Sequence, residues 1–317
     1  MITTRQAAES ALPVFRSAFA APPLFTSDRL GDRPVWEVRD IEGKGKGVVA
    51  IRKIARGEVF MVDYASVLAD VKFPMKINRK IGRKLLDSAV DRLPDPQKIL
   101  ALGKSSNSKA PASEDVLRTN TFSTTVDGIE YMVLFPTVSR INHACNPSAF
   151  TRIIGKTLST RVVAFRDIEP GEEITISYTE FGLLYKERQK TLLRRWGFKC
   201  SCDLCSASRD EIAASDSRRT RITEIREEVF QAIGKKDFIE AIDLYKELMD
   251  LVKKEQLVSH WGEHYEVLAR LHAAVGDKAG AINYAKLAVE TLTKYGGMEI
   301  YESITELEEL LAGYESA

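Results

Sequence analysis

Hydrophobic and polar positions divide this chain of 317 residues into two parts with different periods. Between residues 36 and 178, short runs rich in valine, isoleucine, phenylalanine and tyrosine alternate with glycine-containing or charged turns, which is typical of β-strands. From about residue 209 onward, apolar residues recur three and four positions apart, as they do on amphipathic helices. The expected strands are WEVRD, GVVAI, EVFMVDY, FSTTV, YMVLF, AFTRII, TRVVAF and EITISY.

A helical insert interrupts the β-rich part, and an apolar, proline-containing segment precedes it. Residues 72–118 are basic and helical in character, and GKSSNSKAPASED at 103–115 predicts a mobile loop. The first thirty or so residues predict a helix followed by an extended lead-in. We therefore expect four parts: an N-terminal segment 1–34, a β-rich domain 35–195 with its insert at about 70–118, a cysteine-containing segment 196–208 and a helical domain 209–317.

Two segments of the C-terminal part carry the clearest helical periodicity. FIEAIDLYKELMDLVKK at 238–254 and AGAINYAKLAVETLTK at 279–294 each contain an Ala-Ile pair near the start. They begin about 40 residues apart, which is longer than the roughly 34 residues of a tetratricopeptide repeat. The pattern predicts two or three irregular repeats, and an unspecialised helical bundle is the alternative.

Charge and hydropathy give no support for a nucleic-acid partner, a membrane partner or a secreted protein. The chain has 46 basic and 45 acidic residues, a net charge of +1, so nothing in the overall charge points to nucleic acid or an anionic membrane. The N-terminus lacks the apolar core of a secretory signal, and no apolar run approaches the roughly 18 to 20 residues that span a bilayer. We expect an intracellular protein of the nucleus, the cytoplasm or both.

The four cysteines are concentrated rather than spread along the chain. Cys200, Cys202 and Cys205 form C-x-C-x-x-C, and Cys145 is the other cysteine. Four thiolates match the tetrahedral preference of structural zinc, so the sequence predicts one structural zinc ion. A redox C-x-x-C pair and ordinary buried cysteines are the alternatives, and Cys145 is the weakest member of the proposed set on spacing alone.

Four segments carry a resemblance to a known family. They are EGKGKGVVAIRKIARGEVF, SRINHACNPSA, EPGEEITISY and GFKCSCDLC. In this order they resemble the G-x-G, N-H-x-C-x-P and G-E-E-[IL]-T-x-x-Y signatures of the SET methyltransferases and their cysteine-rich post-SET segment. The resemblance covers roughly residues 35–206. It implies an α+β protein: a β-rich SET fold with a helical insert and a post-SET zinc site, followed by an all-α, tetratricopeptide-repeat-like domain.

Within the family, the arrangement looks most similar to the SMYD group, with two departures. The MYND zinc finger of that group is absent, because residues 52–144 contain no cysteine and only one histidine, His143. The family core commonly continues to an asparagine where this chain has Ser148, which has fewer hydrogen-bonding groups.

The resemblance implies S-adenosylmethionine as cofactor and a set of site residues. Tyr178 is the expected catalytic residue, and Cys145 is expected to join Cys200, Cys202 and Cys205 on the zinc ion. A substrate channel is implied at Phe122, Trp196 and Phe198. The implied cofactor-binding residues are Lys44, Gly45, Lys46, Gly47, Asn120, Asn142, His143, Tyr178 and Phe198.

The function implied is transfer of methyl groups to lysine side chains of a protein substrate, with histones as one class. The helical domain is expected to hold a peptide or protein partner. A catalytically silent SET scaffold, in which the repeats carry the function, is the alternative, and Ser148 is its best support. Methylation of a non-protein amine is a third reading.

Overall fold

The computed structural model describes residues 34–72, 77–126, 128–257, 261–295 and 301–315, so the predicted N-terminal helix lies outside the described residues. The chain divides into two compact units. One comprises Met1–Tyr178 with Lys190–Cys200, and the other comprises Thr179–Gln189 with Ser201–Ala317. Among the described residues, no helix is both long and apolar enough to cross a membrane.

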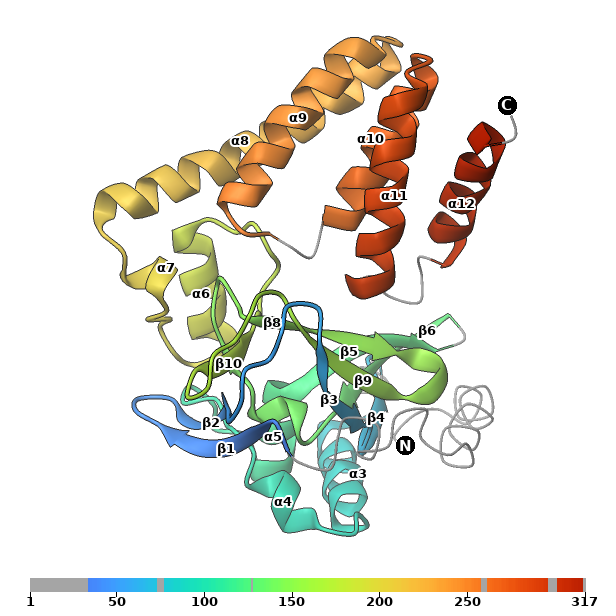
Figure 1. Cartoon of the computed structure of the whole chain (residues 1–317). Coiled ribbons are helices and arrows are strands. Elements are labelled where there is room, and N and C mark those ends of the chain that lie inside the picture. The colour runs from blue at the N-terminus through green and yellow to red at the C-terminus, as the bar shows by residue number, and fades with distance from the viewer. Residues whose placement is uncertain (1–33, 73–76, 127, 258–260, 296–300, 316–317) are drawn as a thin grey trace. The chain divides into compact units, whose positions relative to one another are not determined.

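Three small sheets form the first unit (Figure 1). One has the strand order β1-β2-β10-β7, a second β3-β9-β8 and a third β4-β6-β5. All pairings are antiparallel except β10 with β7, which is parallel. The strands are β1 Trp36–Ile41, β2 Gly45–Ala50, β3 Val59–Tyr64, β4 Val67–Asp70, β5 Thr121–Val126, β6 Ile129–Leu134, β7 Asn142–His143, β8 Ala149–Ile154, β9 Ser159–Ala164 and β10 Glu173–Ile176.

A continuous apolar core joins these sheets. Val48 on β2, Phe60 on β3, Tyr131 on β6 and Ile174 on β10 are at most 2% exposed and belong to one cluster. Buried apolar side chains from strands of all three sheets supply this core, so the predicted β-rich fold is confirmed. The eight expected strands are all present, and β4 and β7 are additional.

The helical insert lies between β4 and β5. It consists of α3 Arg79–Asp91, α4 Pro96–Leu100 and α5 Ala112–Asn120. Asn78 and Asp95 cap the first two helices by accepting hydrogen bonds from Lys80 N and Lys98 N. The loop predicted for 103–115 is too long, because α5 begins at Ala112.

The connecting loop of the insert is also anchored by side chains. Ser106 Oγ donates a hydrogen bond to Gly197 O at 2.5 Å, and Asn107 Nδ2 donates to Leu193 O at 2.6 Å. These bonds satisfy carbonyl groups at the end of α6 Tyr185–Trp196. The predicted loop is therefore tied to the segment that carries Trp196.

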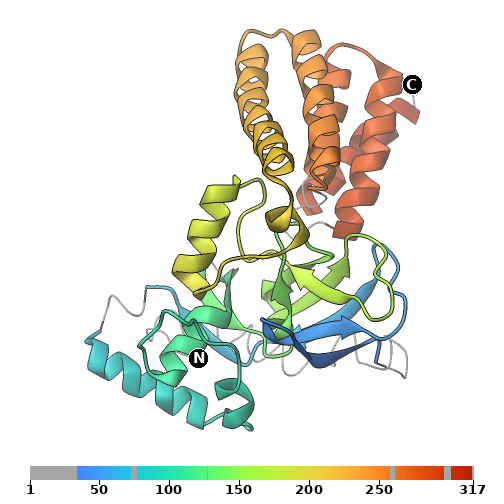
Figure 2. The same cartoon turned by 90° about the vertical axis from the view of Figure 1, so that its left-hand side faces the viewer.

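The second unit contains the helices of the C-terminal part (Figures 1 and 2). After the short α7 Asp203–Ser206 come α8 Arg209–Gly234, α9 Phe238–Lys254, α10 Trp261–Ala274, α11 Lys278–Tyr295 and α12 Tyr301–Glu315. Neighbouring helices in sequence pack on one another, and Ile225, Leu248, Val252 and Leu268 are buried in one of the shared cores. The expected helical C-terminal region is confirmed, whereas its assignment as tetratricopeptide-like stays a prediction.

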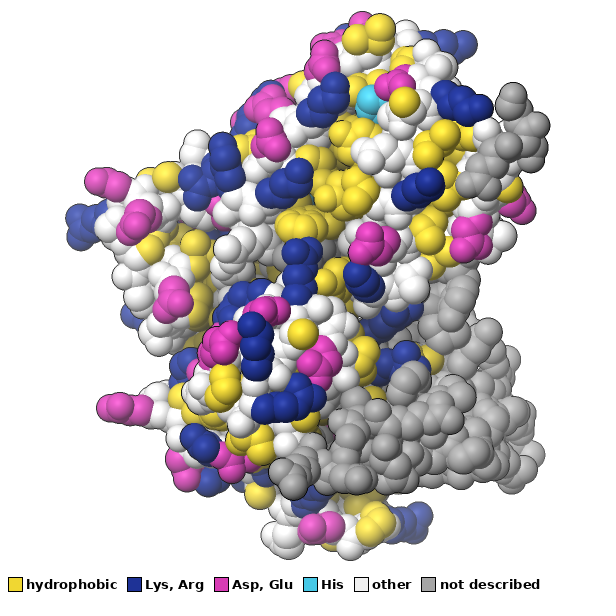
Figure 3. All heavy atoms as spheres, viewed as in Figure 1, with side chains coloured by type: hydrophobic (Ala, Val, Ile, Leu, Met, Phe, Trp, Pro, Cys, Tyr) yellow, Lys and Arg dark blue, Asp and Glu magenta, His cyan; other side chains and the backbone are white. Residues whose placement is uncertain are grey.

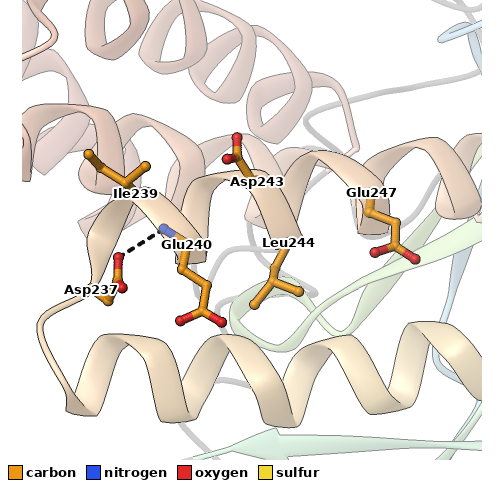
Figure 4. Close-up of a pocket in the computed structure, with 6 residues that line it drawn as sticks. All are labelled: Asp237, Ile239, Glu240, Asp243, Leu244 and Glu247. Atoms are coloured by element: carbon orange, nitrogen blue, oxygen red, sulfur yellow. Dashed lines mark hydrogen bonds between the residues drawn. The ribbon is translucent and has the colours of Figure 1, made fainter.

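The outer surface of α9 is acidic. Asp237 caps the helix by accepting a hydrogen bond from Glu240 N at 3.1 Å (Figure 4). Asp243 and Glu247 follow along the same helix, and with Ile239 and Leu244 these residues line a shallow cavity of about 520 Å³. On the face seen in Figure 3, hydrophobic side chains gather between α9 and α11, with charged side chains around them.

A buried ionic network holds α8 to the end of α9, and it generates a stability prediction. The Glu255 carboxylate accepts from Ser215 Oγ, Arg218 Nε and Arg219 Nε at 2.6–2.7 Å, and Arg219 and Glu255 are almost fully buried. Glu255→Gln would leave Arg219 buried without its counter-charge. We expect a loss of about 3–5 kcal/mol in the free energy of unfolding, measured by urea denaturation.

Glu247→Gln is the matched control, because Glu247 pairs with Arg221 at the exposed surface. It should cost much less than Glu255→Gln. Equal losses in the two variants would contradict the importance assigned to burial.

Candidate functional site

Pairing of β7 with β10 brings together residues that are about thirty positions apart. Thr175 lies opposite Asn142, and Ile176 lies opposite His143. The chain then continues to Tyr178, whose backbone N–H donates to His143 Nδ1 at 2.9 Å. Its hydroxyl donates to Ile141 O at 2.7 Å, so both ends of the tyrosine are fixed to the segment around β7.

Aromatic rings surround Tyr178. The ring centroids of His143, Trp196 and Phe198 lie 5.3, 5.2 and 6.5 Å from that of Tyr178. Trp196 is held from its other side, because its indole N–H donates to Thr119 O at 2.9 Å. Four of the predicted site residues therefore form one aromatic cluster. Phe122 packs with Tyr178 against the core of the unit, and its ring lies 5.9 Å from Phe135.

The environment of Tyr178 keeps its hydroxyl neutral. Burial raises the pKa of Tyr178 well above its ordinary value of about 10, and the negative charge of Glu173 raises it further. The hydroxyl proton is used in the bond to Ile141 O, so the oxygen presents its lone pairs to any further group. The side chain can therefore accept a hydrogen bond from a substrate N–H.

Glu173 connects two of the predicted cofactor residues. Its carboxylate accepts from Lys44 Nζ at 2.6 Å and from Asn142 Nδ2 at 2.9 Å. A Cβ on Gly47 would lie 2.5 Å from Ile41 Cγ1, 2.7 Å from Asn142 Nδ2 and 3.1 Å from Glu173 Oε1, so any larger residue here would displace these side chains. Sequence reasoning missed Glu173, although it stands in the GEEIT segment that was singled out.

Lys46 and Asn120 are placed differently. Lys46 Nζ pairs with Asp40 at 2.7 Å on the exposed β1–β2 hairpin, and Gly45 supplies the positive φ of +74° that this hairpin needs. Asn120 is buried at the end of α5, where its amide nitrogen donates to Gly103 O and Val116 O. Among the bonds that these two side chains make, none goes to Glu173 or to its partners Lys44 and Asn142.

Ser148, the departure from the family pattern, is fully buried and bonded to β10. Its hydroxyl accepts from Thr175 N at 3.0 Å, and its own N–H donates to Thr175 Oγ1 at 3.1 Å. These bonds satisfy two backbone donors that would otherwise be buried without partners. In this chain the serine thus supports the strand that pairs with Asn142.

The four cysteines form one cluster. The sulfur atoms of Cys145, Cys200, Cys202 and Cys205 all lie within 4.8 Å of one another, and none is in a disulfide. A set of four thiol sulfurs this close fits the tetrahedral coordination of zinc, whose bonds to sulfur are about 2.3 Å long. The turn at α7, where Cys205 N donates to Cys202 O at 2.8 Å, brings the last two cysteines together.

Two nitrogen groups face the sulfur atoms. Arg188 Nε donates to Cys205 Sγ at 3.4 Å, and His143 Nε2 lies 3.3 Å from Cys145 Sγ. Thiolates bound to a metal carry excess negative charge, which such N–H groups offset. His143 was predicted only as a cofactor residue, although it stands two positions before Cys145, and Arg188 was not predicted at all.

A separate cavity of about 600 Å³ lies on the α3 side of the β4-β6-β5 sheet. Thr121 and Ser123 line it, and strand alternation directs Phe122, between them, to the opposite face. None of the predicted site residues lines this cavity. It is therefore distinct from the cluster around Tyr178.

Comparison with known proteins identifies the β-rich part. Residues 45–179 match the family model of the SET domain. This part of the chain is a SET domain. The match contains Asn142, His143 and Tyr178 and ends one residue beyond the tyrosine.

Relatives with the same domain align over limited segments. Histone-lysine N-methyltransferase set5 of Schizosaccharomyces pombe is 41% identical over 85 residues, which are 26% of this chain and 27% of that protein. Human histone-lysine N-methyltransferase SMYD3 is 29% identical over 147 residues, covering 46% and 28%. Arabidopsis thaliana histone-lysine N-methyltransferase ATXR2 is 44% identical over 73 residues, covering 22% and 15%. The chain thus spans less than a third of each of these relatives.

The cysteine cluster generates a metal-binding prediction. We expect the full chain to bind one equivalent of zinc, and cobalt substitution to give the intense charge-transfer absorption of a four-thiolate site. Because the chain's four cysteines are all in the cluster, chelation should make four thiols reactive at once.

Cys202→Ser should weaken zinc binding by about 10-fold or more, whereas Ser201→Ala, next to it, should leave binding unchanged. Absorption typical of mixed oxygen and sulfur ligands in the wild-type chain would contradict the four-thiolate site.

Proposed function

We propose that the chain is an S-adenosylmethionine-dependent methyltransferase that acts on lysine side chains of protein substrates. The observation that carries the proposal is the fixed Tyr178 hydroxyl inside an aromatic cluster, within a SET domain. The relatives named above are histone-lysine N-methyltransferases, which supports the same reaction class. S-adenosylmethionine, when bound, supplies an electrophilic methyl group.

Tyr178 would act as the catalytic residue by orienting the lysine amine. Its proton is committed to Ile141 O, so its oxygen is free to accept a hydrogen bond from the amine N–H. The apolar walls of Trp196 and Phe198, with Phe122 farther back, would exclude water and favour the uncharged amine. In-line methyl transfer needs mainly this alignment and desolvation.

The cofactor would lie beside Glu173 and the two residues that bond it, Lys44 and Asn142. Asn142, His143 and the Gly45–Gly47 backbone would contact it, with Phe198 as a stacking surface. Lys44 is the cation we assign to the cofactor's carboxylate, because it lies beside Glu173, the partner of Asn142, whereas Lys46 pairs with Asp40 on the hairpin. Asn120 would contribute its side-chain oxygen.

A protein is the substrate class that we propose, with histones as the first candidates because the relatives' names specify them. The helical C-terminal part would recruit the protein partner, in the nucleus or the cytoplasm. A silent scaffold is the alternative function. The bonds of Ser148 to Thr175 favour the enzyme, because they give the departure from the family pattern a role inside the fold.

Cofactor binding is tested by calorimetric titration of the zinc-loaded protein with S-adenosylmethionine and its demethylated product. We expect saturable binding of both, weakened about 10-fold by Asn142→Ala, which removes a polar contact. Asn107→Ala is the control, because this side chain bonds Leu193 O in the loop of the insert. Absence of binding to either ligand would favour the scaffold.

Catalysis is tested by Tyr178→Phe, which removes only the hydroxyl. We expect methyl transfer to a histone mixture to fall by about 100-fold or more, with a much smaller change in cofactor affinity. Tyr245→Phe is the control: its buried hydroxyl bonds His264 in the helical unit. An undiminished rate in Tyr178→Phe would remove the tyrosine from the mechanism.

A further inference from the structure

His143 lies between two groups that belong to different parts of the site. One ring nitrogen, Nδ1, accepts the backbone N–H of Tyr178 at 2.9 Å. The other, Nε2, lies 3.3 Å from Cys145 Sγ, within hydrogen-bonding range for sulfur. The side chain is 4% exposed, so water does not compete freely for either nitrogen.

The first contact fixes the tautomer. A backbone N–H can only donate, so Nδ1 must present its lone pair, and the proton of the neutral ring lies on Nε2. Nε2–H then points toward Cys145 Sγ and can donate to it. A metal-bound thiolate is a better acceptor than a thiol, so the bond becomes stronger when the metal site is occupied.

We propose that His143 is a positioning residue that couples the metal site to Tyr178. This inference rests on the proposed function, because it assumes that the cysteines hold zinc and that Tyr178 orients the substrate. The imidazole ring is rigid, so its two hydrogen bonds move together. A displacement of Cys145 on metal loss would turn the ring and weaken its hydrogen bond to the backbone N–H of Tyr178. The residue that carries the catalytic hydroxyl would then be held less firmly.

Arg188 provides an internal comparison. It also donates to a cysteine of the cluster, Cys205, at 3.4 Å. It also contacts Leu183 O and Asp216, within the same unit as itself. Arg188 therefore donates to a cysteine of the cluster as His143 can, whereas the acceptor of the Tyr178 N–H is His143.

The bond to sulfur is tested directly by replacing zinc with the spin-half isotope of cadmium in the full chain. An N–H···S–Cd bond transmits scalar coupling, so we expect a cross-peak between cadmium and the Nε2 proton of a histidine. The peak should vanish in His143→Asn and persist in His272→Asn, which changes a buried histidine of the helical unit. No cross-peak in the wild-type protein would overturn the proposal.

The coupling is tested by two variants that each keep one half of the ring's bonding. Asparagine places an amide oxygen near the Nδ1 position, and glutamine places an amide N–H near the Nε2 position. His143→Asn should keep the Tyr178 amide protected from hydrogen exchange but release the metal to a chelator about 10–100-fold faster. His143→Gln should reverse this pattern, with near-normal metal release and an amide that exchanges at least about 10-fold faster.

Arg188→Gln should speed metal release without changing exchange at the Tyr178 amide. If both His143 variants altered both readouts equally, the residue would be a general packing element and the proposal would fail. None of these measurements depends on methyl transfer, so a negative result here would not contradict the proposed methyltransferase activity. Conversely, a protein that bound no cofactor could still show the coupling between the metal site and Tyr178.

Discussion

The parallel contact between β7 and β10 is the interaction on which the site depends. β10 lies between β2 and β7, so one short strand receives the glycine-rich hairpin on one edge and the Asn142–His143 dipeptide on the other. Asn142 reaches Glu173 from β7, and Lys44 reaches it from the turn that precedes β2. Because β7 has only two residues, its position relies on side-chain bonds: Asn142 to Glu173, His143 to the Tyr178 amide and Ser148 to Thr175.

Runs of β-type residues between turns, and helical spacing of apolar residues, predicted most of the fold. β3 and β9 could be predicted because each is a run of β-branched or apolar residues, although five of the six residues of β9 are buried. The helix α9 begins and ends at the residues where its pattern does. β4 was missed because it has only four residues and follows β3 after two residues, with no glycine or proline between them. β7 was missed because a two-residue strand has no period.

The long helix α8 shows a different limit. It buries Ser215 and Arg219 beside Ile222 and Ile225, so polar groups stand where an amphipathic pattern would have apolar ones. Both side chains donate to Glu255, forty positions away from Ser215 along the chain. Glu173 was missed for the same reason. A carboxylate whose partners come from distant strands looks, in sequence, like any surface acid.

The cysteine set could be predicted because metal coordination restricts residue type and number more tightly than packing does. What the sequence could not predict is which charged side chain is buried beside the cluster. Arg188 is 1% exposed, a burial that would be costly for an unpaired guanidinium. Its bonds to Leu183 O and Cys205 Sγ and its proximity to Asp216 explain how the charge is accommodated.

Burial would shift the pKa values of Tyr178 and of a substrate lysine in opposite directions if the two groups met in the proposed channel. Burial raises the pKa of an acid such as Tyr178, and it lowers the pKa of an amine such as a substrate lysine, because both shifts favour the uncharged form. The aromatic cluster of Trp196 and Phe198 would thus keep the hydroxyl protonated and the amine deprotonated in the same range of pH. A neutral nucleophile and a neutral hydroxyl oxygen that accepts its N–H are what methyl transfer requires. No general base with a pKa near neutrality is needed beside them.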